Sequence, residues 1–391
     1  MPEVRRAAIG AVGNAVRFLD RRSRSVEAVN RILVCAIGGI GNTLLLAPLL
    51  RVLRESRPGG RVDLLLTNRA AVSLADEFGL ADEVLFVPEE EWHRGLHGVR
   101  IFATLRRRQY DAVLRTFLTA ADVSRASLGV YASGARIRIA YGSREGCPLE
   151  SHVLQLDLRL PEVERHLPLA RALGMTIPVR FEPLRAPERG RRWAEEFARS
   201  HGFDDRPLLG LHPGSDPVWM AKRWPAERFG ALARLAGERF GMRPVVFGGP
   251  SDREAVARAM AAADGSALQA TGQDIVQTAA LIERCRAFVS NDSGLMHLAS
   301  ALDVPTLAIF GPTDPVKNRP LGPRTRILRL GLECSPCDLE TATRRCAHRD
   351  CLNKLDVLQV LRALQTLLGE SPQDPTSRRE PISRPMELGA P

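Results

Sequence analysis

The chain has 391 residues, of which 45% are hydrophobic and 26% are charged, and its formal net charge at pH 7 is +10. This length is long for a single hydrophobic core and predicts two globular domains. No apolar run reaches the roughly 18 residues that a membrane-spanning helix requires. Aromatic residues make up only 5% of the chain and no basic-aromatic motif occurs, so nucleic acid is not an expected partner.

Residues 1–30 form a basic N-terminal segment. Arginines outnumber acids by seven to three within residues 1–31. Four apolar residues recur there at helical spacing: Ile9, Val12, Val16 and Leu19. Two interpretations stay open, a helix that rests on an anionic membrane surface and a solvated basic helix. The segment lacks the uninterrupted apolar core of a signal peptide. We therefore expect a cytoplasmic protein, peripheral at the inner membrane under the first interpretation.

The stretch AIGGIGNTLLLAP, residues 36–48, predicts a turn from a strand to a helix. A continuously apolar run precedes it, as in a parallel strand buried on both faces, and leucines at i, i+3, i+4 and i+7 follow it. Gly39 and Gly41 lie in the turn, and Asn42 and Thr43 are the expected N-caps of the helix. A dinucleotide-binding turn is disfavoured, because the spacing is G-G-x-G and the next strand does not end in an acid.

Units of strand and helix continue along the chain. Apolar runs alternate with helical or polar stretches to about residue 140, which predicts a parallel α/β sheet in a first domain, residues 31–180. A second α/β series begins at RPLLGLHPGSD and predicts a second domain, residues 181–368. Its strands end in Gly, Pro, Ser or Asp, and ligands in open α/β sheets bind beyond the carboxyl ends of the strands. We therefore expect the second domain to carry the main ligand-binding site. Residues 369–391 are rich in proline and charge, which predicts a disordered tail.

Three ordered blocks carry a resemblance to a known family: GGIGNTLLLAPLLRVLRESRP, HPGSDPVWMAKRWPAERFGALARLAGERFGMRPVVFGGPSD and NDSGLMHLASALDVPTLAIFGPTDP. Together they resemble glycosyltransferase family 9, the lipopolysaccharide heptosyltransferases, over about residues 31–365. The resemblance implies a GT-B fold, in which two Rossmann-like domains face each other across a cleft, the first for the acceptor and the second for the nucleotide sugar. It also implies an inverting, metal-independent transfer. The sugar would be a heptose or a similar one, moved from a nucleotide diphosphate such as ADP-heptose to a lipopolysaccharide-core or other cell-envelope glycan, lipid-linked or oligosaccharide.

Within this resemblance, Lys222 in AKRWP matches the family's phosphate-contacting lysine. A cation at that place stabilises the charge that the leaving diphosphate develops, so a catalytic role is expected. Asp292 and Ser293 are expected to cap a helix whose free N–H groups meet the diphosphate or the sugar, with a glycine next to them for close approach. In the turn FGGPSDRE, either Asp252 or Glu254 is expected to bind the ribose. The expected donor-binding residues are Gly214, Ser215, Lys222, Asp292, Ser293, Gly294 and His297.

The chain departs from the family in the first block. The family has an aspartate after G-x-G in this loop, proposed as the general base, whereas this chain has Asn42, an amide with no usable basicity at neutral pH. Gly39, Gly41 and Asn42 form the expected acceptor-side loop. Either Asn42 only orients the acceptor and another group takes the proton, with Asp111 and Asp122 as substitutes, or the chain is a catalytically silent nucleotide-sugar or glycan-binding relative.

Four of the seven cysteines cluster near the end of the second domain: Cys334, Cys337, Cys346 and Cys351. Four thiolates so close in sequence can form a tetrahedral zinc site, but only the first pair has the C-x2-C spacing of a zinc finger. A cytoplasmic compartment argues against disulfides. A structural zinc site and four free thiols both stay open, and no cofactor is expected for catalysis.

Overall fold

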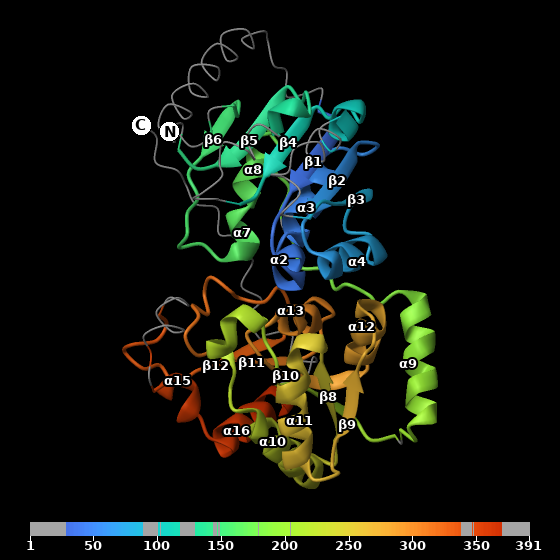
Figure 1. Ribbon diagram of the computed structural model, residues 1–391, viewed down its shortest axis with the longest axis vertical. Coiled ribbons are helices and arrows are strands. Elements are labelled where there is room, and N and C mark those ends of the chain that lie inside the picture. Colours follow the sequence, from blue (N-terminus) through green and yellow to red (C-terminus); the bar gives the residue numbers. More distant parts are fainter. Residues whose placement is uncertain are drawn as a thin grey trace. The chain divides into compact units, whose positions relative to one another are not determined.

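The computed structural model describes residues 29–88, 101, 103–117, 130–143, 147, 149–178, 180–203, 205–337, 346 and 348–369 (Figure 1). The expectations for the basic segment and for the tail fall almost entirely outside these residues. The chain divides into two compact units, Met1–Val179 (unit 1) and Arg180–Pro391 (unit 2).

Unit 1 is built on a six-stranded sheet in the order β3-β2-β1-β4-β5-β6, with parallel pairing throughout. Its strands are β1 (Arg31–Cys35), β2 (Arg61–Leu66), β3 (Glu83–Phe86), β4 (Ala112–Arg115), β5 (Ile137–Tyr141) and β6 (His152–Leu154). Its helices include α2 (Ile40–Leu45), α3 (Ala47–Glu55), α4 (Arg69–Glu77), α7 (Glu162–Arg165) and α8 (Leu167–Arg171). Strand β1 is buried from Ile32 to Cys35, as its continuous apolar run predicts.

The helix after β1 starts earlier than its sequence predicts. Helix α2 begins at Ile40, and Gly39 is its N-cap, so the expectation of a cap at Asn42 or Thr43 is wrong. Gly38 has a φ of 108°, a conformation that glycine adopts readily, and it turns the chain sharply after β1. The helix has therefore already begun when the chain reaches the two polar residues.

Unit 2 holds a second six-stranded parallel sheet, in the order β12-β11-β10-β7-β8-β9. Its strands are β7 (Leu208–His212), β8 (Arg243–Gly248), β9 (Leu268–Thr271), β10 (Cys285–Asn291), β11 (Thr306–Ile309) and β12 (Thr325–Leu328). Its helices include α9 (Glu188–Ser200), η3 (Pro217–Lys222), α10 (Ala226–Phe240), η4 (Pro250–Asp252), α11 (Arg253–Ala263), α12 (Ile275–Glu283), α13 (Gly294–Ala301), α15 (Asp350–Asn353) and α16 (Val357–Gly369).

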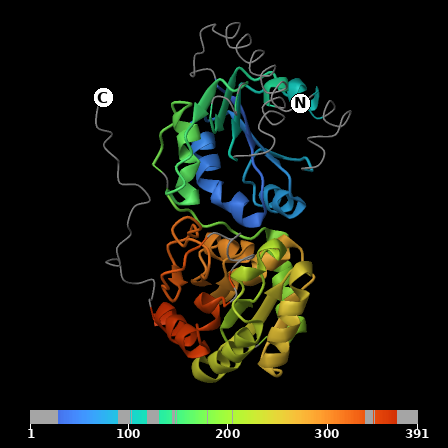
Figure 2. The same cartoon turned by 60° about the vertical axis from the view of Figure 1, so that its left-hand side comes forward.

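The core of unit 2 is centred on Trp224, which is fully buried beside Phe229. Its indole nitrogen donates to the carbonyl of Leu355 (2.8 Å), just before α16. Helix α16, drawn in red in Figure 2, packs its apolar face into the same core as α10. Neither α16 nor any other helix in the described part of the chain has the length and apolar content to cross a membrane.

The strand order reverses at corresponding places in the two sheets. In unit 1, β1 pairs with β2 on one side and with β4 on the other. In unit 2, β7 pairs in the same way with β8 and β10. Open α/β sheets bind ligands at such switch points, beyond the carboxyl edge of the sheet, where the loops after two neighbouring strands diverge. In unit 1 these are the loops after β1 and β4. In unit 2 they are the loops after β7 and β10.

Candidate functional site

Asn291, the last residue of β10, connects the two loops at the switch point of unit 2. Its side-chain amide donates to the carbonyls of Pro213 (2.9 Å) and Gly214 (3.1 Å), and its oxygen accepts the backbone N–H of Trp224 (2.9 Å). The fully buried Trp224 follows Lys222 by two residues. One buried asparagine thus fixes two segments: residues 212–215, called the HPGS loop below, and the end of η3, which carries Lys222. Sequence reasoning did not single it out.

Lys222 and Asp292 form an ion pair immediately before α13. The lysine nitrogen lies 3.1 Å from Oδ2 of Asp292, with the two side chains only 13% and 5% exposed. Asn318 donates to the same oxygen (3.3 Å). The N-cap of α13 is Ser293 alone, whose hydroxyl accepts the N–H of Met296, so the expectation that Asp292 shares this cap is wrong. The site therefore presents a cation and free helix N–H groups, the elements of an anion-binding site.

His297 lies in the first turns of α13, close to the same pair. The residue is 5% exposed, and its Nδ1 has no hydrogen-bond partner among the described residues. Burial lowers the pKa of His297 to about 4, although the negative charge of Asp292 opposes the shift. The imidazole is therefore neutral at pH 7. In this form it can donate or accept a hydrogen bond to a ligand without adding charge to the site.

A second buried network lies beneath the HPGS loop. His212 Nε2 is 3.3 Å from Oδ2 of Asp252, and its Nδ1 is 3.0 Å from the hydroxyl of Ser293, the cap of α13. Arg223 donates to the other oxygen of Asp252 (3.1 Å). Burial opposes ionisation of Asp252, but the hydrogen bond and charge of His212, the N–H of Gly249 and the charge of Arg223 together lower its pKa. The network links the loop after β7 to the start of α13.

Gly214 and Ser215, both expected at the donor site, are held by this network. A Cβ atom at Gly214 would lie 2.1 Å from Oδ1 of Asp252, so only glycine fits. Arg223 donates to the hydroxyl of Ser215 (3.1 Å) and to its carbonyl (2.9 Å). Both carboxylate oxygens of Asp252 are engaged inside the protein, which leaves Glu254, 79% exposed, as the solvent-facing acid of the two considered for the ribose.

The glycine turn of unit 1 places Asn42 against an acid that sequence reasoning missed. The Asn42 amide nitrogen donates to Oε1 of Glu162, the first residue of α7 (3.0 Å). Asp111, considered as a substitute base, lies at the other end of β1, where its carboxylate accepts the backbone N–H groups of residues 30 and 31. It is therefore a structural cap of the strand start. Asp122 lies outside the described residues.

Comparison with known proteins identifies the family. A sequence model described as glycosyltransferase family 9 (heptosyltransferase) matches residues 99–348. The chain belongs to glycosyltransferase family 9. The resemblance drawn from the three sequence blocks is thereby confirmed, and the chain is a glycosyltransferase.

Relatives of this family 9 protein cover most of its length. Lipopolysaccharide heptosyltransferase 2 of Salmonella typhimurium is 30% identical over 322 residues, which cover 77% of this chain and 88% of the relative. A family 9 glycosyltransferase from Veillonella parvula has a similar structure, with a TM-score of 0.77, 26% identity and coverage of 88% and 98%. The ADP-heptose lipopolysaccharide heptosyltransferase II of E. coli gives a TM-score of 0.70, 25% identity and coverage of 86% and 98%. The predicted GT-B class, with two Rossmann-like domains, is confirmed.

In this glycosyltransferase the cysteine-rich segment braces the loop after β11. Ser335 donates its hydroxyl to the carbonyl of Gly311 (2.6 Å), and the N–H of Cys337 donates to that of Pro312 (2.8 Å). The same loop continues to Asn318, which contacts Asp292. None of the four clustered cysteines is in a disulfide bond, and the described residues hold no group of three or more His, Cys, Asp or Glu side chains arranged for a metal ion.

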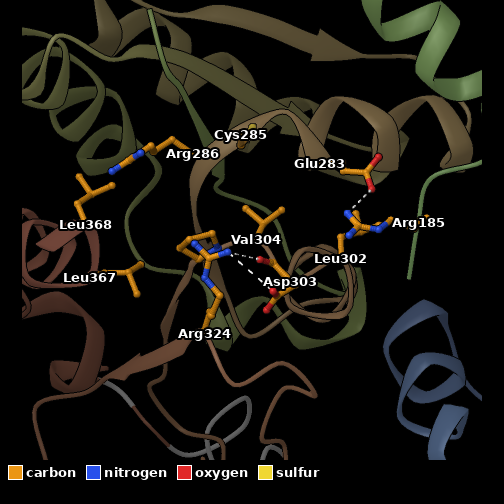
Figure 3. A pocket seen from close by; sticks show the side chains of 11 residues that line it. Arg185, Glu283, Cys285, Arg286, Leu302, Asp303, Val304, Arg324, Leu367 and Leu368 are labelled. Carbon is orange, nitrogen blue, oxygen red and sulfur yellow. Dashed lines mark hydrogen bonds and ion pairs between the residues drawn. The ribbon is translucent and has the colours of Figure 1, made fainter. Parts of the chain in front are cut away.

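A cavity of about 390 Å³ lies in unit 2 at the opposite edge of the sheet, by the amino ends of β10, β11 and β12 (Figure 3). Two of its arginines are paired with acids in its wall, Arg185 with Glu283 (3.6 Å) and Arg324 with Asp303 (3.8 Å). Because the cavity lies at the amino ends of the strands, it is distinct from the Lys222 site, which lies beyond their carboxyl ends.

Proposed function

We propose that this glycosyltransferase moves a heptose, with inversion, from ADP-heptose to a lipopolysaccharide-core or other cell-envelope glycan acceptor. The observation that carries the proposal is the Lys222–Asp292 pair at the start of α13. Support for the sugar and the acceptor comes from relatives named as lipopolysaccharide heptosyltransferases. Support for the adenine nucleotide comes from the E. coli relative named for ADP-heptose, which is 25% identical.

The chemistry of unit 2 fits departure of a diphosphate. As the bond between the sugar and the phosphate breaks, negative charge grows on the leaving oxygen. Lys222 and the free N–H groups of α13 supply positive charge for it, and no metal ion is required in this role. His297, neutral at pH 7, lines the same place. We therefore propose that Gly214, Ser215, Lys222, Asp292, Ser293, Gly294 and His297 form the donor site.

A catalytically silent relative is the alternative, and Asn42 is the reason to consider it. The relatives named above are all transferases, so this alternative has no support from them.

We propose a cytoplasmic enzyme that works at the inner membrane, where the basic segment, residues 1–30, would contact anionic lipid.

The test of this function is ADP release. With ADP-heptose and a lipopolysaccharide-core oligosaccharide, we expect ADP and a heptosylated product to form together, and in a binding screen ADP-heptose should bind more tightly than GDP- or UDP-sugars. Donor binding without product would favour the silent relative. If the protein binds no nucleotide sugar at all, both the transferase proposal and the silent-relative alternative are contradicted.

A separate proposal is that the four clustered cysteines bind structural zinc. It rests on their spacing, and binding would have to draw the four thiolates around one point. Protein purified without added metal should then contain about one zinc per chain, and a chelator should lower its melting temperature. Elemental analysis that finds no metal, with four thiols titrating freely, would exclude the site.

A further inference from the structure

The proposed transfer needs a proton acceptor in unit 1. The acceptor hydroxyl must lose its proton as its oxygen attacks the sugar, and a positioned base commonly takes it. The side chain at the glycine turn is Asn42, and a carboxamide does not accept a proton at neutral pH. A different group must therefore do so.

Asn42 is held in one orientation, and that orientation points its amide nitrogen at a carboxylate. A Cβ atom at Gly38 would lie 2.7 Å from Oδ1 of Asn42, so the absence of a side chain there lets the asparagine fold back over the turn. Its nitrogen then donates to Oε1 of Glu162 (3.0 Å). The reversed amide would set its oxygen against the carboxylate, and two acceptor oxygens that face each other repel, so the assignment with the nitrogen toward Glu162 is the favoured one.

Glu162 has the exposure and freedom that a base requires. It is half-buried next to the exposed Asn42, and it forms no ion pair with any described residue. Asp63 and Glu150, the fully buried acids described in unit 1, are instead committed to arginines at 2.8 and 3.0 Å. An accessible carboxylate that contacts the switch-point turn is placed to take a proton from a hydroxyl bound there.

We propose that Glu162 is the catalytic base of this enzyme and that Asn42 is the residue that positions it. The O–H bond of the acceptor breaks and its proton passes to the Glu162 carboxylate. The freed electron pair forms the new bond to the anomeric carbon, and the bond to the diphosphate breaks, with its electron pair leaving on the nucleotide. Glu162 then returns the proton to solvent. This inference rests on the proposed glycosyl transfer.

The first test is Glu162→Gln, which keeps an oxygen for Asn42 but has no basicity. We expect kcat for transfer to fall by ~10²–10⁴, with the KM for ADP-heptose and the affinity for ADP within twofold of wild type. Glu164→Gln, a half-buried glutamate on the same helix, is the matched control and should keep the wild-type rate. If wild type transfers sugar and Glu162→Gln does so equally well, the inference is overturned. If the wild-type protein transfers no sugar, the proposed function is contradicted, and the assignment of Glu162 as its base is contradicted as well.

A second test separates a chemical role from a structural one. In Glu162→Ala, added formate should restore transfer in proportion to its concentration, because a small carboxylate can replace the missing base. Asn42→Ala should lower kcat roughly tenfold in wild type, as expected for losing a hydrogen bond to a charged group, and should have no further effect in the Glu162→Gln background. Absence of formate rescue, or equal effects of Asn42→Ala in both backgrounds, would overturn the assignment.

Discussion

Replacing Lys222 by alanine should lower the rate of sugar transfer by ~10²–10³ while the protein stays folded. The lysine nitrogen lies 3.1 Å from Asp292 at the start of α13, where the diphosphate charge would develop. Because the ammonium group stabilises that charge more in the transition state than in the bound donor, the loss should appear mainly in kcat. Steady-state kinetics with ADP-heptose measures it, and circular dichroism verifies the fold.

The control for this prediction is a lysine of the same unit that is also paired with an aspartate. Lys354 lies 2.7 Å from Asp350, but this pair joins the two ends of α15, with Lys354 exposed and Asp350 half-buried. Lys354→Ala therefore removes a similar contact without touching the proposed donor site, and its transfer rate should equal that of wild type. A Lys222→Ala variant that also transfers at the wild-type rate would remove Lys222 from the mechanism.

Elements with local signals could be predicted from the sequence. The apolar run before the glycine turn gave β1, and the leucine spacing after it gave α3. Lys222 and the residues around Asp292 were singled out because they stand in sequence blocks that resemble a family, and the structure brings Lys222 and Asp292 together. In each case the signal lies within a few residues of the feature it predicts.

Features that depend on distant contacts could not be predicted. The bond between Asn42 and Glu162 joins residues 120 positions apart, and nothing in the sequence around Glu162 marks it. The role of Asn291 depends in the same way on loops about 77 positions away. The N-cap of α2 was missed for a different reason, because the positive φ of Gly38 starts the helix before the polar residues that usually cap one.

The substitution Asp252→Asn should lower the free energy of unfolding of unit 2 at pH 7 by about 3–5 kcal/mol, the usual cost of breaking a buried ion pair. Asparagine has the same shape and fits against Gly214, but it leaves Arg223 buried without its counter-charge and turns an N–H group toward Arg223 or His212. Denaturant unfolding followed by tryptophan fluorescence, to which the buried Trp224 contributes, measures the change.

The pH dependence of this loss has a definite sign. The pKa of Asp252 is lowered in the folded protein, so its contribution is fully present above the unfolded-state pKa and is lost as the pH falls through the folded one. The stability gap between wild type and Asp252→Asn should therefore be complete at pH 7 and should shrink below about pH 4, the ordinary pKa of an aspartate.

Asp303 is the matched control, because burial raises its pKa. It has a positive φ of 59°, which asparagine tolerates, so Asp303→Asn should be neutral or stabilising at pH 7. A gap for Asp252→Asn that is the same at pH 7 and pH 3 would show that the carboxylate charge does not stabilise unit 2.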